Sequence, residues 1–137
     1  MYEQLTQYIV ESTNYSDAYK TPVLTAGKSF ILGYTKEETG IFNKLPVIIF
    51  DDFTTSSKYV DFPFKVKSSE MKILNCNPGM NIKFYYYLLQ SLDYDASTHK
   101  RYWISESAQM TVPFPTKEEQ DKIVKNVEQL LNLIDQI

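Results

Sequence analysis

The C-terminal quarter of the sequence limits the possible folds most narrowly, because a signal for a helix start is followed there by a regular apolar pattern. Thr116 and Glu119 have the Thr-x-x-Glu spacing of a capping box, in which each side chain pairs with a backbone N–H that the first helical turn leaves free. Beyond this start, apolar residues recur at alternating intervals of four and three, as in the seam of a coiled coil: Ile123, Val127, Leu130, Ile134 and Ile137. The sequence therefore predicts a long helix with one narrow apolar stripe.

Two interpretations of this stripe are open. An amphipathic helix commonly packs its apolar face on the core of its own domain. Here the pattern is narrow and still in register at Ile137, with no glycine or proline to end the helix. A helix from Lys117 onward would also be about 30 Å long, which is more than the edge of a small domain usually covers. We therefore expect residues 116–137 to form an assembly arm, with the five stripe residues as its dimerisation contact.

The remaining residues, 1–115, are expected to form one domain. The chain has 137 residues, of which 43% are apolar and 15% aromatic, which is enough for one core and too little for two. Its single cysteine, Cys76, has no partner for an intrachain disulfide and no Cys or His neighbours at metal-binding spacing. No apolar run reaches the roughly 20 residues of a membrane span, and residues 1–4 lack the basic start of a secretory signal. We expect a cytoplasmic protein without a structural metal or a cofactor.

Charge is distributed unevenly along the chain. The formal net charge is −3, which by itself argues against binding to nucleic acid, because phosphate binding depends on Lys and Arg. Residues 58–101, however, contain six Lys and one Arg against four acidic residues, whereas the segments on either side are both net negative. A basic face on an acidic protein is one interpretation of this distribution, and an ordinary solvated surface is the other.

Short runs rich in β-branched and aromatic residues, separated by turn-forming residues, dominate the chain before the C-terminal helix. Strands are expected at residues 8–10, 22–25, 30–32, 47–50, 62–66, 71–74 and 109–114, with loops at 26–29, 51–58 and 93–100. A helix is expected from Asn81, because apolar residues recur at helical spacing between Phe84 and Leu92. The expected fold class is α+β, with a mixed, twisted, mainly antiparallel sheet, a few short helices and the long C-terminal helix.

One constellation matches the carboxylate site of metal-dependent nucleases. Asp51-Asp52 follows an expected strand, and Glu70-Met71-Lys72 leads into another, as where two carboxylates hold Mg²⁺ and a lysine assists the attacking water. A nuclease using Asp52, Glu70 and Lys72 is therefore the enzyme alternative. Turn chemistry explains the same residues, because Asp51-Asp52 opens a loop rich in Thr and Ser. We favour this second interpretation and expect no catalytic residues.

Three polar segments carry groups that can contact nucleic acid. Residues 97–103 place His99 beside Lys100 and Arg101, a set better suited to phosphates and base edges than to proton transfer, although an exposed polar loop explains it too. Residues 26–29 end like a phosphate loop, but the first glycine is missing and a strand follows, so only a glycine turn presenting Lys28 is expected. Residues 52–58 offer four hydroxyls and one ammonium, which surface solubility explains nearly as well.

Four segments of the chain are informative when taken together and in order. They are residues 19–35, residues 46–58, residues 99–105, and Pro113-Phe114-Pro115 with Glu119, Gln120 and Ile123. This set resembles the target recognition domain of the DNA specificity subunit of type I restriction-modification systems. The likeness spans nearly the whole chain, and its closing Pro-x-Pro…Glu-Gln…Ile piece is fairly specific.

The resemblance implies a module that reads DNA and performs no chemistry itself. In that family the specificity subunit holds two methyltransferase subunits and recruits restriction subunits, and two recognition domains, spaced by antiparallel helices, each read one half of a split target. This chain carries one such domain and one helix, so a homodimer through its helices would restore the pair and read a symmetric bipartite site. The alternatives are a fragment or split-gene product that awaits a complementary piece, and a protein-interaction domain that binds no DNA.

Candidate DNA contacts follow from side-chain chemistry, because the contacts of that family vary with the target sequence. The candidates are Lys28, Thr55, Ser57, Lys58, Lys100, Arg101 and Tyr102. Arg101 is the candidate for a bidentate guanine contact, and the lysines are candidate phosphate anchors. The expected partners are double-stranded DNA, methyltransferase and restriction subunits, and a second copy of the chain, with no membrane.

Overall fold

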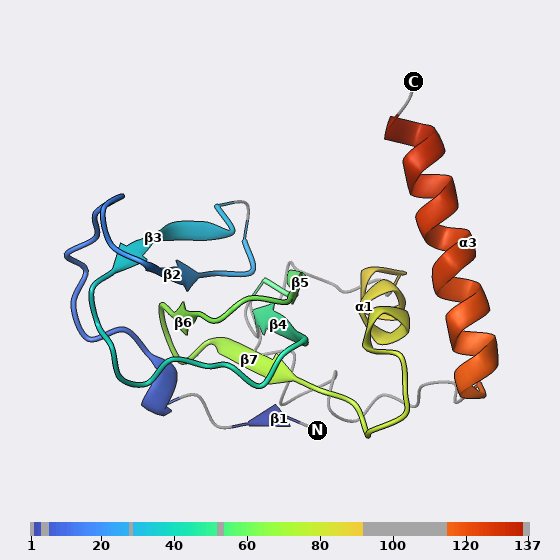
Figure 1. The fold of residues 1–137 in the computed structure, drawn as a ribbon, viewed down its shortest axis with the longest axis horizontal. Coiled ribbons are helices and arrows are strands. Elements are labelled where there is room, and N and C mark those ends of the chain that lie inside the picture. The colour runs from blue at the N-terminus through green and yellow to red at the C-terminus, as the bar shows by residue number, and fades with distance from the viewer. Residues whose placement is uncertain (1, 4–5, 28, 52–53, 92–114, 136–137) are drawn as a thin grey trace.

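The strands of this chain form two β-sheets (Figure 1). The computed structural model describes residues 2–3, 6–27, 29–51, 54–91 and 115–135. Within these ranges, the larger sheet has the strand order β1-β7-β4-β5 and is antiparallel throughout. The smaller sheet has the order β3-β2-β6, with β2 antiparallel to β3 and parallel to β6. The expected α+β class with mainly antiparallel strands is confirmed, although the strands divide between two sheets.

The strands are short, and the helices differ in length. The larger sheet contains β1 (Tyr2–Glu3), β4 (Val47–Asp51), β5 (Ser57–Val60) and β7 (Met71–Leu74). The smaller sheet contains β2 (Thr21–Leu24), β3 (Ile31–Thr35) and β6 (Lys65–Val66). The helices are the 3-10 turn η1 (Thr6–Tyr8), α1 (Ile82–Ser91) and the 19-residue α3 (Lys117–Asp135).

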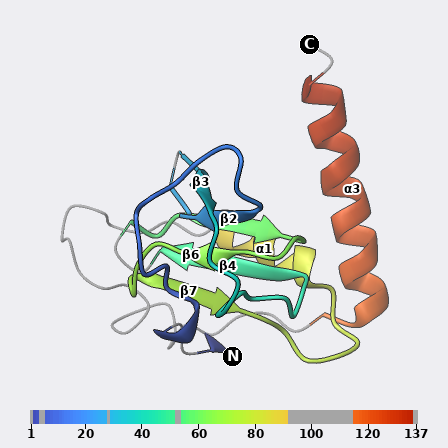
Figure 2. The same ribbon diagram turned by 60° about the vertical axis from the view of Figure 1, so that its left-hand side comes forward.

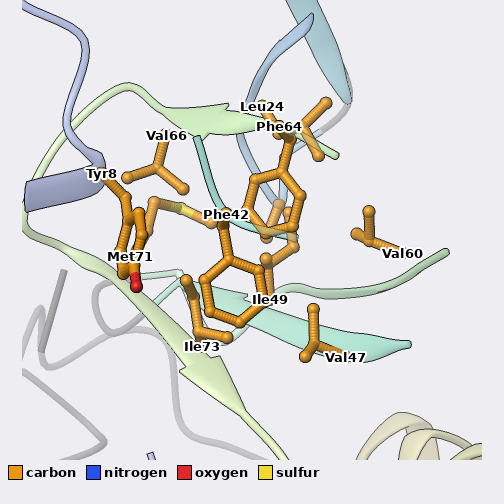
Figure 3. Packing of buried hydrophobic residues seen from close by; sticks show 11 residues of the cluster. Tyr8, Leu24, Phe42, Val47, Ile49, Val60, Phe64, Val66, Met71 and Ile73 are labelled. Carbon is orange, nitrogen blue, oxygen red and sulfur yellow. The ribbon is translucent and has the colours of Figure 1, made fainter. Parts of the chain in front are cut away.

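The main core lies between the two sheets. Ile49 and Ile73 from the larger sheet pack with Leu24 from the smaller one, and aromatic rings fill the space among them (Figure 3). Phe42 has its ring centroid 5.1 Å from Tyr8 in an edge-to-face arrangement. Full burial of side chains of this size is the dominant stabilising contribution in a small domain, at about 1.5–3 kcal/mol each.

The opposite face of the larger sheet is covered by α1. Ile48 and Phe50 alternate with the core-facing residues of β4 and form a second cluster with Ile82 of the helix. Alternate residues of a strand point to opposite faces, so a strand covered on both sides has to be apolar throughout. This explains why Val47–Phe50 reads as an unbroken apolar run and why all four residues are buried.

One buried ion pair ties two loop segments, residues 11–12 and residues 37–39, to β6. Lys65 is only 3% exposed, its ammonium lies 3.1 Å from the Glu37 carboxylate, and it donates a hydrogen bond to the Thr39 carbonyl. The same carboxylate accepts the backbone N–H groups of Glu11 and Ser12. Burial raises the pKa of Glu37, but these N–H groups and the ammonium lower it by more, so that the pKa is below its ordinary value.

Two expectations about local structure were wrong, and both errors arise from contacts distant in sequence. Residues 8–10 were expected to form a strand. Instead, Tyr8 is the last residue of η1, and Ile9 forms an isolated β-bridge with Val66. Residues 57–58, expected in a loop, begin β5, because the buried Ser57 receives hydrogen bonds from Gln90 of α1. Residues 109–114, expected as a strand, lie outside the described residues.

The long helix α3 lies beside α1 and then extends beyond it. Both ribbon views show its C-terminal half projecting away from the sheets (Figures 1 and 2). No helix in the described ranges is both long and apolar enough to cross a membrane. The expected start of α3 is confirmed, because the Thr116 hydroxyl accepts the Glu119 N–H at 3.2 Å.

Candidate functional site

The C-terminal half of α3 exposes a large apolar surface. Leu130 is 60% and Ile134 62% exposed, and Ile123, nearer the start of the helix, is 41% exposed. Three of the five predicted stripe residues are thus left uncovered by the chain's own core, while Val127 is half-buried and Ile137 lies outside the described residues. Exposed apolar side chains gathered on one helix face are the usual sign of a protein contact.

Two further apolar residues widen this surface. Leu131 is 44% and Leu133 58% exposed, on either side of the predicted seam. The predicted stripe does not include them, because it consists only of apolar residues at intervals of four and three. Below them, Val124 is 5% exposed and packs toward the domain, although it lies between seam positions. The helix therefore turns Val124 to the domain and Leu130 and Ile134 to solvent.

The N-terminal end of α3 is fixed to the domain by a buried amide. Gln120 is fully buried; its Oε1 accepts the backbone N–H of Asn81 at 2.8 Å, and its Nε2 donates to the Pro115 carbonyl at 3.0 Å. The neighbouring Asp121 carboxylate accepts the Asn81 side-chain amide at 2.8 Å. The sequence marked Gln120 only as part of the Pro-x-Pro…Glu-Gln…Ile piece of the resemblance and did not predict this structural role.

A second link joins the two helices farther along. The ammonium of Lys83 in α1 lies 3.2 Å from the Glu128 carboxylate in α3, with both side chains about 40% exposed. The hydrogen bond to Glu128 raises the pKa of Lys83. The Lys83 ammonium also lies 5.3 Å from the centre of the Tyr59 ring.

The β4–β5 turn carries Thr55, one of the candidate DNA contacts. Thr55 has φ 63°, a left-handed conformation that is rare for a β-branched residue and costs on the order of 1–3 kcal/mol. The turn is closed by the Thr55 N–H donating to the Asp51 carbonyl at 2.8 Å, and by the Asp51 side chain accepting the Thr54 N–H at 3.0 Å. A strained turn of fixed shape is typical of segments that present groups to a ligand.

The other described candidates differ in their surroundings. Ser57 is 6% exposed, and its hydroxyl accepts a hydrogen bond from Gln90 at 2.8 Å, so this side chain holds α1 to the sheet and is not presented to solvent. Lys58 is half-buried on β5, opposite Ile49. Lys28, Lys100, Arg101 and Tyr102 lie outside the described residues.

Four of the described lysines of the basic middle segment fall into two groups. Lys65 is buried in the ion pair described above, and Lys83 is paired with Glu128. Lys58 and Lys67 have no ion-pair partner among the residues that the structure describes, and Lys67 is exposed. A net positive segment of sequence is therefore not the same as a basic face, because Lys65 and Lys83 pair with carboxylates in the folded chain.

The residues of the nuclease alternative are partly brought together. Asp51 pairs with Met71 across β4 and β7, which places it near Glu70, but its carboxylate serves the turn described above. Lys72 donates to the Ser69 carbonyl at 3.3 Å, and the Ser68 hydroxyl donates to Glu70. No group of three or more His, Cys, Asp or Glu side chains suited to a metal ion occurs in the described part of the chain, from which Asp52 is absent.

The chain is similar to a known restriction-system protein along most of its length. No family model matches the chain. Over 98% of its length, however, the chain is 46% identical to the Type I restriction enzyme EcoR124I/EcoR124II specificity subunit of Escherichia coli. The chain is therefore similar to part of a type I restriction specificity subunit. It spans 35% of the length of that relative, so it corresponds to one part of such a subunit, and the nuclease alternative gains no support.

Proposed function

We propose that this chain is a DNA-reading module of a type I restriction-modification complex and performs no catalysis itself. The observation that carries this proposal is the 46% identity to a specificity subunit along almost the entire chain. Double-stranded DNA is then the ligand, and the methyltransferase and restriction subunits of such a complex are the protein partners. The setting is the cytoplasm, where the DNA is.

Within this proposal the two parts of the chain have separate tasks. Residues 1–115 form the recognition domain, and residues 116–137 form the helix that spaces and assembles it. Two copies pair through the exposed residues of α3, which supplies the two recognition domains that a split target requires. The 60% and 62% exposure of Leu130 and Ile134 supports this pairing, because burying such side chains against a second helix stabilises a dimer by about 1.5–3 kcal/mol each.

The DNA-contacting residues are proposed from chemistry and accessibility. Thr55 and Lys58 remain candidates in the described structure. Four further candidates lie outside the described residues and rest on their chemistry alone: Lys28, Lys100, Arg101 and Tyr102. Ser57 is withdrawn from this set, since its hydroxyl is buried and bonded to Gln90. Arg101 is proposed to read a guanine and Lys58 to hold a phosphate.

Selection from a pool of random duplexes tests the function. The purified chain, alone and with a type I methyltransferase subunit, is expected to enrich a symmetric bipartite sequence, with affinity that falls steeply as salt rises. Enrichment of no sequence under either condition would refute the proposal. A plasmid incubated with the chain and Mg²⁺ is expected to stay intact, whereas cleavage would revive the nuclease alternative.

Two substitutions separate base reading from phosphate binding. Arg101→Ala is expected to cost about 1–3 kcal/mol on the selected site and to relax specificity at one base position. Lys58→Ala is expected to weaken binding to all duplexes alike and to reduce the slope of log affinity against log salt by about one. Fluorescence anisotropy on the selected and a scrambled duplex measures both, with exposed Lys122→Ala as a control. Equal losses on both duplexes for Arg101→Ala would remove it from the reading set.

A further inference from the structure

We propose that Gln120 is a positioning residue that fixes the direction of α3 relative to the recognition domain and thereby sets the spacing between the two half-sites on DNA. This inference rests on the proposed function and identifies what controls one property of it. The evidence is the set of polar contacts at the junction of α1 and α3.

The first part of the evidence is that Asn81 bonds the starts of both helices. Its side-chain oxygen accepts the Lys83 N–H at 3.0 Å, which caps α1. Its side-chain amide donates to Asp121 and its backbone N–H donates to Gln120, both at 2.8 Å. The first turns of α1 and α3 are therefore held together through a single residue.

The second part is that the Gln120 amide is paired on both sides inside the protein. Its oxygen is bonded to Asn81 and its nitrogen to the Pro115 carbonyl, and the nitrogen also lies 3.5 Å from the Tyr85 hydroxyl. Hydrogen bonds weaken steeply with misalignment, whereas apolar contact is non-directional. A buried amide held in this way restricts the angle of the helix more strongly than an apolar side chain of equal size would.

The third part is a second point of attachment. The Lys83–Glu128 ion pair lies eight residues beyond Gln120, about 12 Å along the helix axis. Val124, between the two attachments, is 5% exposed against the domain. A rigid rod held at two separated points has a defined direction, and the residues that follow, 129–135, are all exposed and add no further support.

The direction of this rod matters because two recognition domains are positioned through it. A tilt of about 10° over a 19-residue helix of about 28 Å displaces the far end by about 5 Å, which exceeds the base-pair rise of about 3.4 Å. A small loss of angular restraint at the junction would thus let the second domain reach neighbouring spacings. Contacts inside each domain would be unaffected, so the half-site sequence read would stay the same.

Gln120→Met tests this inference, because methionine keeps the side-chain volume and removes both hydrogen bonds. Gln129→Met, the same substitution at an exposed position of the same helix, is the matched control. Both are measured on duplexes that differ only in the number of base pairs between the half-sites. Gln120→Met is expected to keep the half-site sequence and to lower the preference for the best spacing over its neighbours about fivefold, the factor that corresponds to one hydrogen bond.

A distance measurement without DNA provides an independent readout. Spin labels at Lys36→Cys in the domain and Asn132→Cys in α3, in a Cys76→Ser background diluted with unlabelled chain, report the angle between the two within one molecule. The expected result is a narrow distance distribution for the unsubstituted chain and for Gln129→Met, and a broad one for Gln120→Met. Unchanged distances with unchanged spacing preference for Gln120→Met would overturn the inference.

The outcomes separate this inference from the proposed function. If the unsubstituted chain selects no DNA, the proposed function fails, and the distance distributions still decide whether Gln120 orients α3. If Gln120→Met does not fold, Gln120→Asn replaces it, which keeps the amide but shortens the side chain by one methylene, so that it cannot reach Asn81 and Pro115 together. Gln120→Asn is expected to broaden the distances and to weaken the spacing preference in the same direction, and no change in either would refute the inference.

Discussion

The N-terminal part of α3, residues 117–128, and its C-terminal part, residues 129–135, are surrounded by different chemistry. The first part meets the domain through a buried amide, a carboxylate bonded to Asn81 and an ion pair, with Val124 as its buried apolar residue. In the second part, residues 129–135 make no polar contact of this kind within the described structure, and all of them are exposed, including four large apolar ones. The contrast lies within one unbroken helix.

This contrast indicates that the two parts of the helix have different roles. Polar, directional contacts orient the first part, and they contribute little net free energy because water competes for the same groups. Apolar surface on the second part remains available, and its burial would contribute about 25 cal/mol per Å². Contacts within the chain therefore orient α3, whereas the free energy of association would come from burying its second part against another molecule.

The largest effect is expected from charges placed on the exposed part. Leu130→Glu with Ile134→Glu puts two carboxylates in the proposed dimer contact, where burying unpaired charges costs several kcal/mol per ion. The mass measured by light scattering should fall from that of a dimer to that of a monomer. Gln129→Glu with Asn132→Glu adds the same charge outside the predicted seam and should leave the dimer intact. An unchanged mass for the first variant would mean that these residues do not form the contact.

A smaller effect is expected from loss of the buried amide. Gln120→Ala leaves the Asn81 N–H and the Pro115 carbonyl without their partner, which should lower the free energy of unfolding by about 1–3 kcal/mol. The same change at the exposed Gln129 should stay within about 0.5 kcal/mol. Urea denaturation at matched protein concentration measures both, and equal midpoints would show that the Gln120 contacts add nothing to stability.

The smallest effect is expected from protonation of Asp121. The Lys117 ammonium and the Asn81 amide hold the pKa of this carboxyl below its ordinary value. A lowered pKa in the folded state means a contribution present above the ordinary aspartate range and lost as the pH falls through the folded-state pKa. Acid should therefore loosen the attached part slightly more in the unsubstituted chain than in Asp121→Asn, which lacks this titrating carboxyl but keeps Glu128. Spin-label distances measured in both chains as the pH is lowered test this prediction. An identical response of the two chains would contradict it.

Much of the fold could be predicted from local sequence patterns. The capping residues of α3 and the apolar runs of β4 and β7 specify their elements without help from distant residues. The exposed Leu130 and Ile134 were also predicted, because a stripe this narrow is more typical of a two-helix contact than of a core.

Other features depend on contacts that no local pattern contains. β5 begins with polar residues, and its buried first residue, Ser57, pairs with Phe50 of β4 and is bonded to Gln90 of α1. The role of Gln120 depends on Asn81, which is 39 residues away. The lysines of the middle segment were counted as surface charge, but Lys65 is buried in an ion pair with Glu37. Polar residues are the hardest to place from sequence, because a buried partner reverses their usual preference for solvent.

The central claim is that two copies of this chain pair through the exposed part of α3 to place two recognition domains on one duplex. Sedimentation of the unsubstituted chain with the duplex found by selection measures this directly. The expected result is two chains on each full duplex, bound cooperatively, with much weaker binding to a duplex that carries one half-site. A complex of one chain per full duplex at saturation, formed by a protein that remains monomeric at every concentration, would contradict the claim.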